Sequence, residues 1–130
     1  MNNRSYRFTA KEEELMNLLW EQDRPMTSVE ILEISGIHSW SDNYLPIMLK
    51  SLLKKEAIEV CGYTQCGTQY ARQFRAALSK EEYIARLAVR RGLDKNSVAK
   101  VALAMVDELG EDKDTAIKIL ESVIAELKAK

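Results

Sequence analysis

The side chains best suited to bind another molecule lie in residues 40–55. Hydrogen-bonding, aromatic, aliphatic and cationic groups recur there at the spacing of one face of an α-helix: Asn43, Tyr44, Ile47, Lys50, Ser51 and Lys54. The amide of Asn43 can pair with an adenine edge, Ile47 can contact a thymine methyl group, and lysine ammonium groups bind phosphates. The pattern therefore predicts a DNA-binding surface. Two alternatives stay open: Tyr44 and Ile47 could pack against another helix, and the lysines could form a solvent-exposed face.

The remaining residues do not indicate a catalytic or metal site. Catalysis by a nucleophile or by acid and base needs several groups brought together, and the chain has one histidine, His38, and no glycine-rich phosphate loop. Cys61 and Cys66 are separated by four residues, which does not match a zinc site. We interpret them as reduced thiols, with a redox or metal role as the less favoured alternative. We therefore predict no enzyme, no catalytic residue, no metal and no cofactor.

The charge of the chain argues against binding nucleic acid through bulk attraction. Its 130 residues carry a net charge of -1, and the pI is about 5.9. Cations exceed carboxylates only between residues 50 and 75, which contain Lys50, Lys54, Lys55, Arg72 and Arg75 against Glu56 and Glu59. DNA affinity must then come from placement of charge. No apolar run is long enough to span a bilayer or to act as a signal sequence, so we predict a cytoplasmic protein without membrane insertion.

Three short helices are predicted in the first 55 residues. Capping boxes of Thr9 with Glu12 and of Thr27 with Glu30 start helices that end near Glu21 and at 35–36. Residues Ile31, Leu32 and Ile34 should face inward. The third helix should bury one apolar stripe: Leu45, Met48, Leu49, Leu52 and Leu53.

Pro46 decides where the third helix begins. If Ser41 is the N-cap, Pro46 lies inside the helix and removes a hydrogen bond, at a cost approaching about 3 kcal/mol. If Asn43 is the N-cap, Pro46 lies in the first turn, where no such bond is lost. We favour the second register, which leaves residues 41–44 as a turn presented to DNA.

An alternating pattern after residue 55 predicts a β-hairpin, with strands over 58–63 and 68–72 and a turn at 64–67. A helix-turn-helix followed by a hairpin is a winged helix, so the fold class is mainly α, with this DNA-binding domain over residues 1–76. Further DNA contacts are predicted at the start of the second helix and on the wing. Ser41 is also predicted to contact DNA, together with the residues of the third helix named above. These additional residues are Thr27, Ser28, Ser41, Thr64, Gln65, Thr68 and Arg72.

Residues 77–130 read as three further helices, starting after Ser79, after Asp94 and near Lys113. Their apolar stripes have little else to cover them, so we predict a helical dimerisation region. The residues expected at the dimer interface are Val101, Met105, Leu109, Ile117, Leu120, Ile124 and Leu127. The alternative is a monomer in which these helices fold back on the first domain.

Motifs along residues 8–90 resemble the penicillinase repressor family, which includes the methicillin-resistance and copper-responsive repressors. The matching residues are Phe8, Thr9, Glu12, Glu14, Met16, Leu19, Trp20, Thr27, Glu30, Ile31, Trp40, Ser41, Leu49, Leu52, Lys54, Lys55, Tyr70, Ser79, Glu81, Glu82 and Tyr83. The resemblance implies a dimeric winged-helix repressor of palindromic operator DNA. It also implies a possible sensor protease, because repressors of the β-lactam branch are released by cleavage in their C-terminal domain. The copper branch is disfavoured, because no cysteine follows Cys66.

The third helix departs from the family pattern, which usually begins Ser-x-Lys-Thr-Val. Here Ser41 is followed by Asp42, Asn43, Tyr44 and Leu45. An alternative function is therefore a winged-helix dimer that acts mainly through a protein partner and has weak or lost operator binding.

Overall fold

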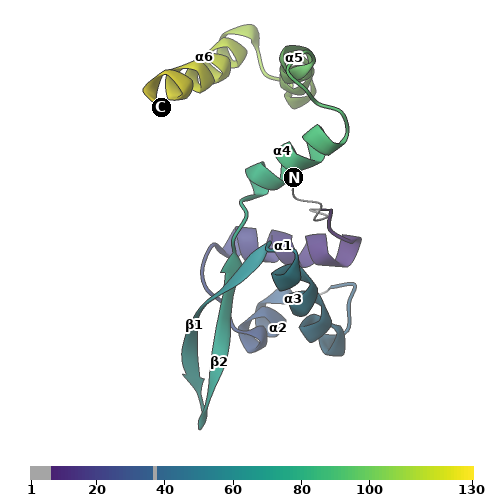
Figure 1. Ribbon diagram of the computed structural model, residues 1–130, viewed down its shortest axis with the longest axis vertical. Coiled ribbons are helices and arrows are strands. Elements are labelled where there is room, and N and C mark those ends of the chain that lie inside the picture. The colour runs from purple at the N-terminus through teal and green to yellow at the C-terminus, as the bar shows by residue number, and fades with distance from the viewer. Residues whose placement is uncertain (1–6, 37) are drawn as a thin grey trace. The chain divides into compact units, whose positions relative to one another are not determined.

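A computed structural model describes residues 7–36 and 38–130. The chain divides into two compact units, Met1–Ala88 and Val89–Lys130. The first contains α1 (Ala10–Gln22), α2 (Ser28–Ser35), the 3-10 helix η1 (Asp42–Tyr44), α3 (Leu45–Lys54), the strands β1 (Ile58–Cys66) and β2 (Gln69–Ala76), and most of α4 (Lys80–Arg90). The second contains α5 (Val98–Leu109) and α6 (Lys113–Ala129). Figure 1 shows the hairpin extending away from α1, α2 and α3, so the first unit is a winged helix-turn-helix, as predicted.

The predicted starts of α1 and α2 are confirmed. In both capping boxes the threonine hydroxyl accepts the glutamate N–H and the glutamate carboxylate accepts the threonine N–H. The segment before α2 also pairs with β2, because the backbones of Met26 and Phe74 exchange two hydrogen bonds of 2.9 and 2.8 Å. This bridge fixes α2 to the sheet.

The third helix begins at Leu45, so Pro46 lies in the first turn, where its missing N–H costs no helical bond. The predicted register is right in this respect. Asn43 is not the cap, however, because η1 occupies Asp42–Tyr44 and Tyr44 precedes α3. The apolar face of α3 packs into the core: Leu45, Met48, Leu49 and Leu52 are buried as predicted, and Leu53 is half-buried.

The wing strands are longer than predicted. Residues 64–66 belong to β1, and the turn is Gly67 and Thr68 instead of 64–67. Gly67 has φ 65°, which glycine adopts without strain. Backbone pairing across the hairpin from Ile58 and Ala76 to Cys66 and Gln69 overrides the weak alternation of the sequence, with a bulge between Val60 and Gly62.

The core of the first unit joins α1, α3, the sheet and the start of α4. Phe8 stacks on Tyr83 with ring centres 4.3 Å apart, and Trp20 donates its indole N–H to the Leu78 carbonyl at 2.7 Å. These contacts anchor α4 by its first turn, where Ser79 and Glu82 form the predicted capping box. The prediction that Ile34 faces inward is wrong, because it is 38% exposed.

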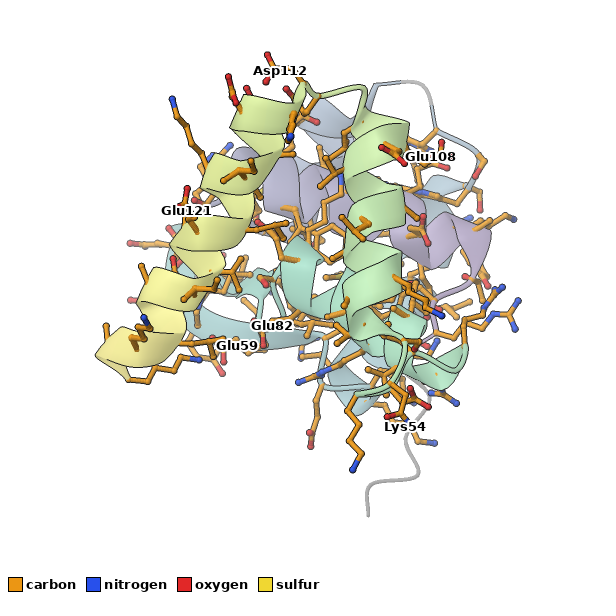
Figure 2. All side chains as sticks on the ribbon, turned by 90° about the horizontal axis from the view of Figure 1, so that it is seen from above. Lys54, Glu59, Glu82, Glu108, Asp112 and Glu121 are labelled. Atoms are coloured by element: carbon orange, nitrogen blue, oxygen red, sulfur yellow. The ribbon has the colours of Figure 1, made fainter. Side chains whose placement is uncertain are left out.

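The second unit consists of two amphipathic helices. Asp94 accepts N–H groups of the turn over residues 95–97, so α5 begins at Val98 and not directly after Asp94. Asp112, labelled in Figure 2, accepts the Thr115 N–H at 2.7 Å and caps α6. No residue of α5 or α6 is buried. In the described part of the chain, no helix is long and apolar enough to cross a membrane.

Candidate DNA-binding surface

The face of η1 and α3 opposite the core is open to solvent. Ser41, Asn43, Lys50 and Lys54 are exposed, and the Ile47 side chain is 58% exposed. An aliphatic side chain so exposed on a well-packed helix is not explained by packing. The structure therefore brings five of the predicted residues to one accessible face.

Tyr44 lies at the border of this face. Its ring is half-buried against the core, and the Lys11 ammonium lies 5.1 Å from the ring centre. The alternative that Tyr44 packs against the first helix is thus partly realised, whereas Ile47 projects outward.

Ser51 has a different environment from the rest of the predicted face. Its hydroxyl donates to the Glu12 carboxylate at 2.6 Å, and the Lys55 ammonium donates to the same carboxylate at 2.6 Å. Burial raises the pKa of Glu12, but the hydrogen bonds from Lys55, Ser51 and Thr9 outweigh it, so the pKa lies below its ordinary value of 4.5. The Ser51 hydroxyl is therefore used inside the domain.

The cations of residues 50–75 fall into two groups. Lys55 is bound by Glu12, and Arg75 donates to Glu59 at 2.8 Å. Lys50 and Lys54 have no ion pair with any described residue (Lys54 is labelled in Figure 2), and the Arg72 guanidinium lies 5.1 Å from the centre of the Phe74 ring. Lys50, Lys54 and Arg72 are the cations available to phosphates.

The start of α2 has fewer side-chain groups available to bind DNA than the sequence predicts. The Thr27 side chain is buried, and its hydroxyl and N–H both bond to Glu30 within the capping box. Ser28 is half-buried at the first helical position.

The predicted wing residues lie on different faces of the hairpin. Tyr63 pairs with Arg72 and Gln65 pairs with Tyr70, and side chains alternate along a strand, so these four share one face. Thr64 pairs with Ala71 on the opposite face, and Thr68 lies in the turn.

Sequence reasoning missed the two tyrosines of this wing, Tyr63 and Tyr70, which are 66% and 71% exposed. Their spacing relative to Gln65 and Arg72 was the available signal. No Asp or Glu occurs between residues 60 and 74. This carboxylate-free part of the hairpin, in a chain rich in carboxylates, suits a polyanion.

The turn before η1 is held by contacts that the sequence also did not reveal. The Ser39 N–H and hydroxyl donate to the two carboxylate oxygens of Glu14 at 3.0 and 2.7 Å. His38 stacks on Trp40 with ring centres 3.8 Å apart, and its Nδ1 lies 2.5 Å from the Trp40 carbonyl oxygen. A carbonyl can only accept, so Nδ1 carries the proton.

Most residues predicted at the dimer interface carry exposed apolar surface. The exposed fractions are 46% for Met105, 70% for Leu109, 44% for Ile117, 50% for Ile124 and 61% for Leu127. Val101 and Leu120 are half-buried.

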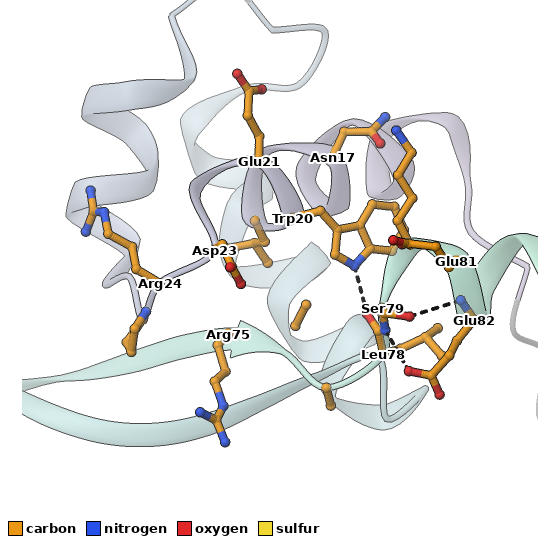
Figure 3. A pocket seen from close by; sticks show the side chains of 15 residues that line it. Asn17, Trp20, Glu21, Asp23, Arg24, Arg75, Leu78, Ser79, Glu81 and Glu82 are labelled. Carbon is orange, nitrogen blue, oxygen red and sulfur yellow. Dashed lines mark hydrogen bonds between the residues drawn. The ribbon is translucent and has the colours of Figure 1, made fainter. Parts of the chain in front are cut away.

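A separate groove lies beside Trp20, between the end of α1 and the start of α4 (Figure 3). Two of its cations are already paired, Arg24 with Glu30 and Arg75 with Glu59, and the third, Lys80, shares the lining with Glu81 and Glu82. None of the predicted DNA-binding residues lines this groove.

The helix-turn-helix, its open third helix and the hairpin wing together define a winged-helix DNA-binding regulator. Residues 8–126 match the penicillinase repressor family, so the chain belongs to that family, as the motifs indicated. The protein is a transcriptional repressor by family and not an enzyme. No curated protein sequence matches the chain significantly.

Proposed function

We propose that this repressor acts as a dimer on palindromic operator DNA, with the exposed face of η1 and α3 in the major groove. The single observation that carries the proposal is that face itself, on which Asn43 and Ile47 are exposed beside Lys50 and Lys54, two cations that form no ion pair with a described residue. A recognition helix enters the groove with its N-terminal residues nearest the base edges. Ser41, Asn43, Tyr44 and Ile47 would then face bases, and the lysines would face phosphates.

The wing would contact the neighbouring backbone. Gln65 and Arg72 support this role because they share an exposed face with two tyrosines, whose hydroxyl groups can donate to phosphate oxygens. Thr64 and Thr68 would contribute from the opposite face and the tip, and Ser28 from the start of α2. We assign Thr27 and Ser51 weaker roles, because their hydroxyls already have partners within the domain.

A homodimer is supported by the exposed apolar faces of α5 and α6 within the predicted dimerisation region, residues 77–130. Two copies related by a two-fold axis would cover these faces reciprocally, and the same symmetry would present two α3 helices to a palindrome. A sensor protease that cleaves this region remains a prediction from the family resemblance.

The number of available cations sets the expected salt dependence. Lys50, Lys54 and Arg72 give about six phosphate contacts per dimer, so the logarithm of the binding constant should fall with log salt at a slope of about -5. Changing both lysines to alanine should weaken binding to every sequence and flatten the slope, whereas Asn43→Ala should relax preference at one base pair. Equal effects of these variants on all sequences would contradict the assigned roles.

A second function is favoured by the acidic character of the chain. The net charge is -1, and Asp42 is exposed at the start of η1, where it would repel phosphates. In that case the dimer would act mainly through a protein partner. Mobility shifts over genomic fragments at low salt would distinguish the two, because binding no stronger than to random DNA would favour the partner.

A further inference from the structure

The recognition element, defined as residues 39–55, is not fixed by caps of its own. Ser41 before η1 and Tyr44 before α3 make no side-chain capping hydrogen bond. The starts of α1 and α2, by contrast, have complete capping boxes. The Tyr44 and Leu45 N–H groups bond to the carbonyls of Ser41 and Asp42, so the start has backbone partners but no side-chain acceptor that would fix its direction locally. Other contacts must hold the part that would meet DNA.

Helix α1 supplies contacts at the start of the element. The Glu14 carboxylate accepts two hydrogen bonds from Ser39, one from the backbone and one from the hydroxyl. The hydrogen bond from the Ser39 hydroxyl is the main reason that the pKa of Glu14 lies below 4.5. The Lys11 ammonium lies over the Tyr44 ring, one turn before Glu14 on the same helix. A charged carboxylate with two donors in this geometry is a directional restraint.

The same helix holds the end of the element. The buried Glu12 carboxylate accepts hydrogen bonds from Ser51 and Lys55, which are one turn apart on α3. Glu12 and Glu14 therefore hold the element at two separate points, Ser39 before η1 and Ser51 with Lys55 on α3.

We propose that Glu12 and Glu14 are positioning residues for DNA recognition. They set the direction of the recognition element against α1, and sequence preference depends on them although neither side chain lies on the proposed DNA-facing surface. This inference rests on the proposed function. A carboxylate repels phosphates, so its removal should not weaken non-specific binding to DNA. If Glu12 and Glu14 position the recognition element, the loss of either should weaken specific binding alone.

Glu14 is the better residue to test, because its bonds lie at the surface and those of Glu12 are partly buried. Glu14→Ala removes both bonds to Ser39, and Ser39→Ala removes one. Glu21→Ala is the matched control, since it removes the same charge from an exposed position of the same helix, where no hydrogen bond or ion pair joins the Glu21 carboxylate to another described residue.

The experiment uses the full chain. The wild-type protein first selects a duplex from random sequences of about 30 base pairs, long enough for two half-sites. Dissociation constants are then measured for the selected duplex and for a scrambled one, and thermal unfolding confirms that each variant is folded. Glu14→Ala should lower the preference for the selected duplex about tenfold, the effect of losing charge-assisted bonds. The scrambled duplex should bind as well as before or slightly better, because a negative charge is gone.

Further results separate positioning from general weakening. Ser39→Ala should cause an intermediate loss, and the double variant should be no worse than Glu14→Ala alone, because both changes remove one interaction. Unchanged preference in a folded Glu14→Ala variant, or an equal loss in Glu21→Ala, would overturn the positioning role while leaving the proposed function intact. If the wild-type protein selects no duplex, the proposed function itself fails and the positioning role fails with it.

Discussion

Replacing Lys55 by methionine tests the buried ion pair between α1 and α3. The change keeps the aliphatic stem but removes the ammonium group that donates to Glu12 at 2.6 Å. The Glu12 side chain is 5% exposed and that of Lys55 is 22% exposed, so the carboxylate would lose its cation without gaining water. Removing one partner of a buried pair costs about 3 to 5 kcal/mol.

The expected loss is at or below the lower limit of this range. Ser51 and the Thr9 N–H still donate to the carboxylate, and Lys55 is not fully buried. We therefore expect Lys55→Met to lower the free energy of unfolding by about 2 to 3 kcal/mol at neutral pH. Lys54→Met is the matched control, because Lys54 is the exposed neighbour and forms no ion pair with a described residue, so its change should stay within about 0.5 kcal/mol.

The loss should depend on pH in a defined direction. The folded-state pKa of Glu12 lies below 4.5, so its ionised form stabilises the fold above that pH, and this stability is lost as the pH falls through the folded-state pKa. In Lys55→Met the difference from wild type should therefore be full near neutral pH and disappear in acid, where the carboxyl is neutral in both proteins.

Urea unfolding followed by circular dichroism measures both effects, at one protein concentration because association adds to apparent stability. The variant Lys55→Met with Glu12→Gln should recover part of the loss, since no uncompensated charge stays buried. A loss below about 0.5 kcal/mol, or one that is the same at neutral and acid pH, would refute the interpretation of this contact as a buried ion pair.

Other substitutions test the start of α3, the attachment of α4 and the dimer. Pro46→Ala should change stability by less than about 1 kcal/mol in urea unfolding, because the proline lies in the first helical turn. Tyr83→Phe should cost about 1 kcal/mol in the same assay, since the hydroxyl that accepts the Phe8 N–H and donates to Glu13 is lost. Met105→Asp should yield monomers by light scattering, and an unchanged mass would place the interface elsewhere.

The features that could be predicted from sequence are those determined by neighbouring residues. Each capping box needs two residues three apart, so the starts of α1, α2 and α4 follow from Thr9, Thr27 and Ser79. The position of Pro46 in the first turn follows from backbone sterics in the same way. The exact first residue of α3 does not, because η1 takes up Asp42–Tyr44, which a Ser41 cap would have placed in the α-helix and an Asn43 cap would have left in a turn.

Contacts between residues far apart in the chain could not be predicted from the sequence. Glu12 was predicted as a capping residue, but its bonds to Ser51 and Lys55 cross 39 and 43 residues. Ser51 therefore looked like a member of the exposed face although its hydroxyl is bound to Glu12. Ile34 looked like a core residue because of its helical spacing, but it is exposed. Helical periodicity does not say how far the neighbouring elements extend over a short helix.

The placement of carboxylates reconciles an acidic chain with a DNA-binding role. In the first unit, Glu12, Glu14, Glu30 and Glu59 all accept hydrogen bonds from other side chains. Their charge is thus used within the domain, and the wing carries none between residues 60 and 74. Net charge counts these groups equally with exposed ones, whereas a phosphate at the recognition face would be affected mainly by the local charges there. Asp42 is the exposed carboxylate on that face, so it is the residue whose position relative to DNA most directly decides between operator binding and a protein partner.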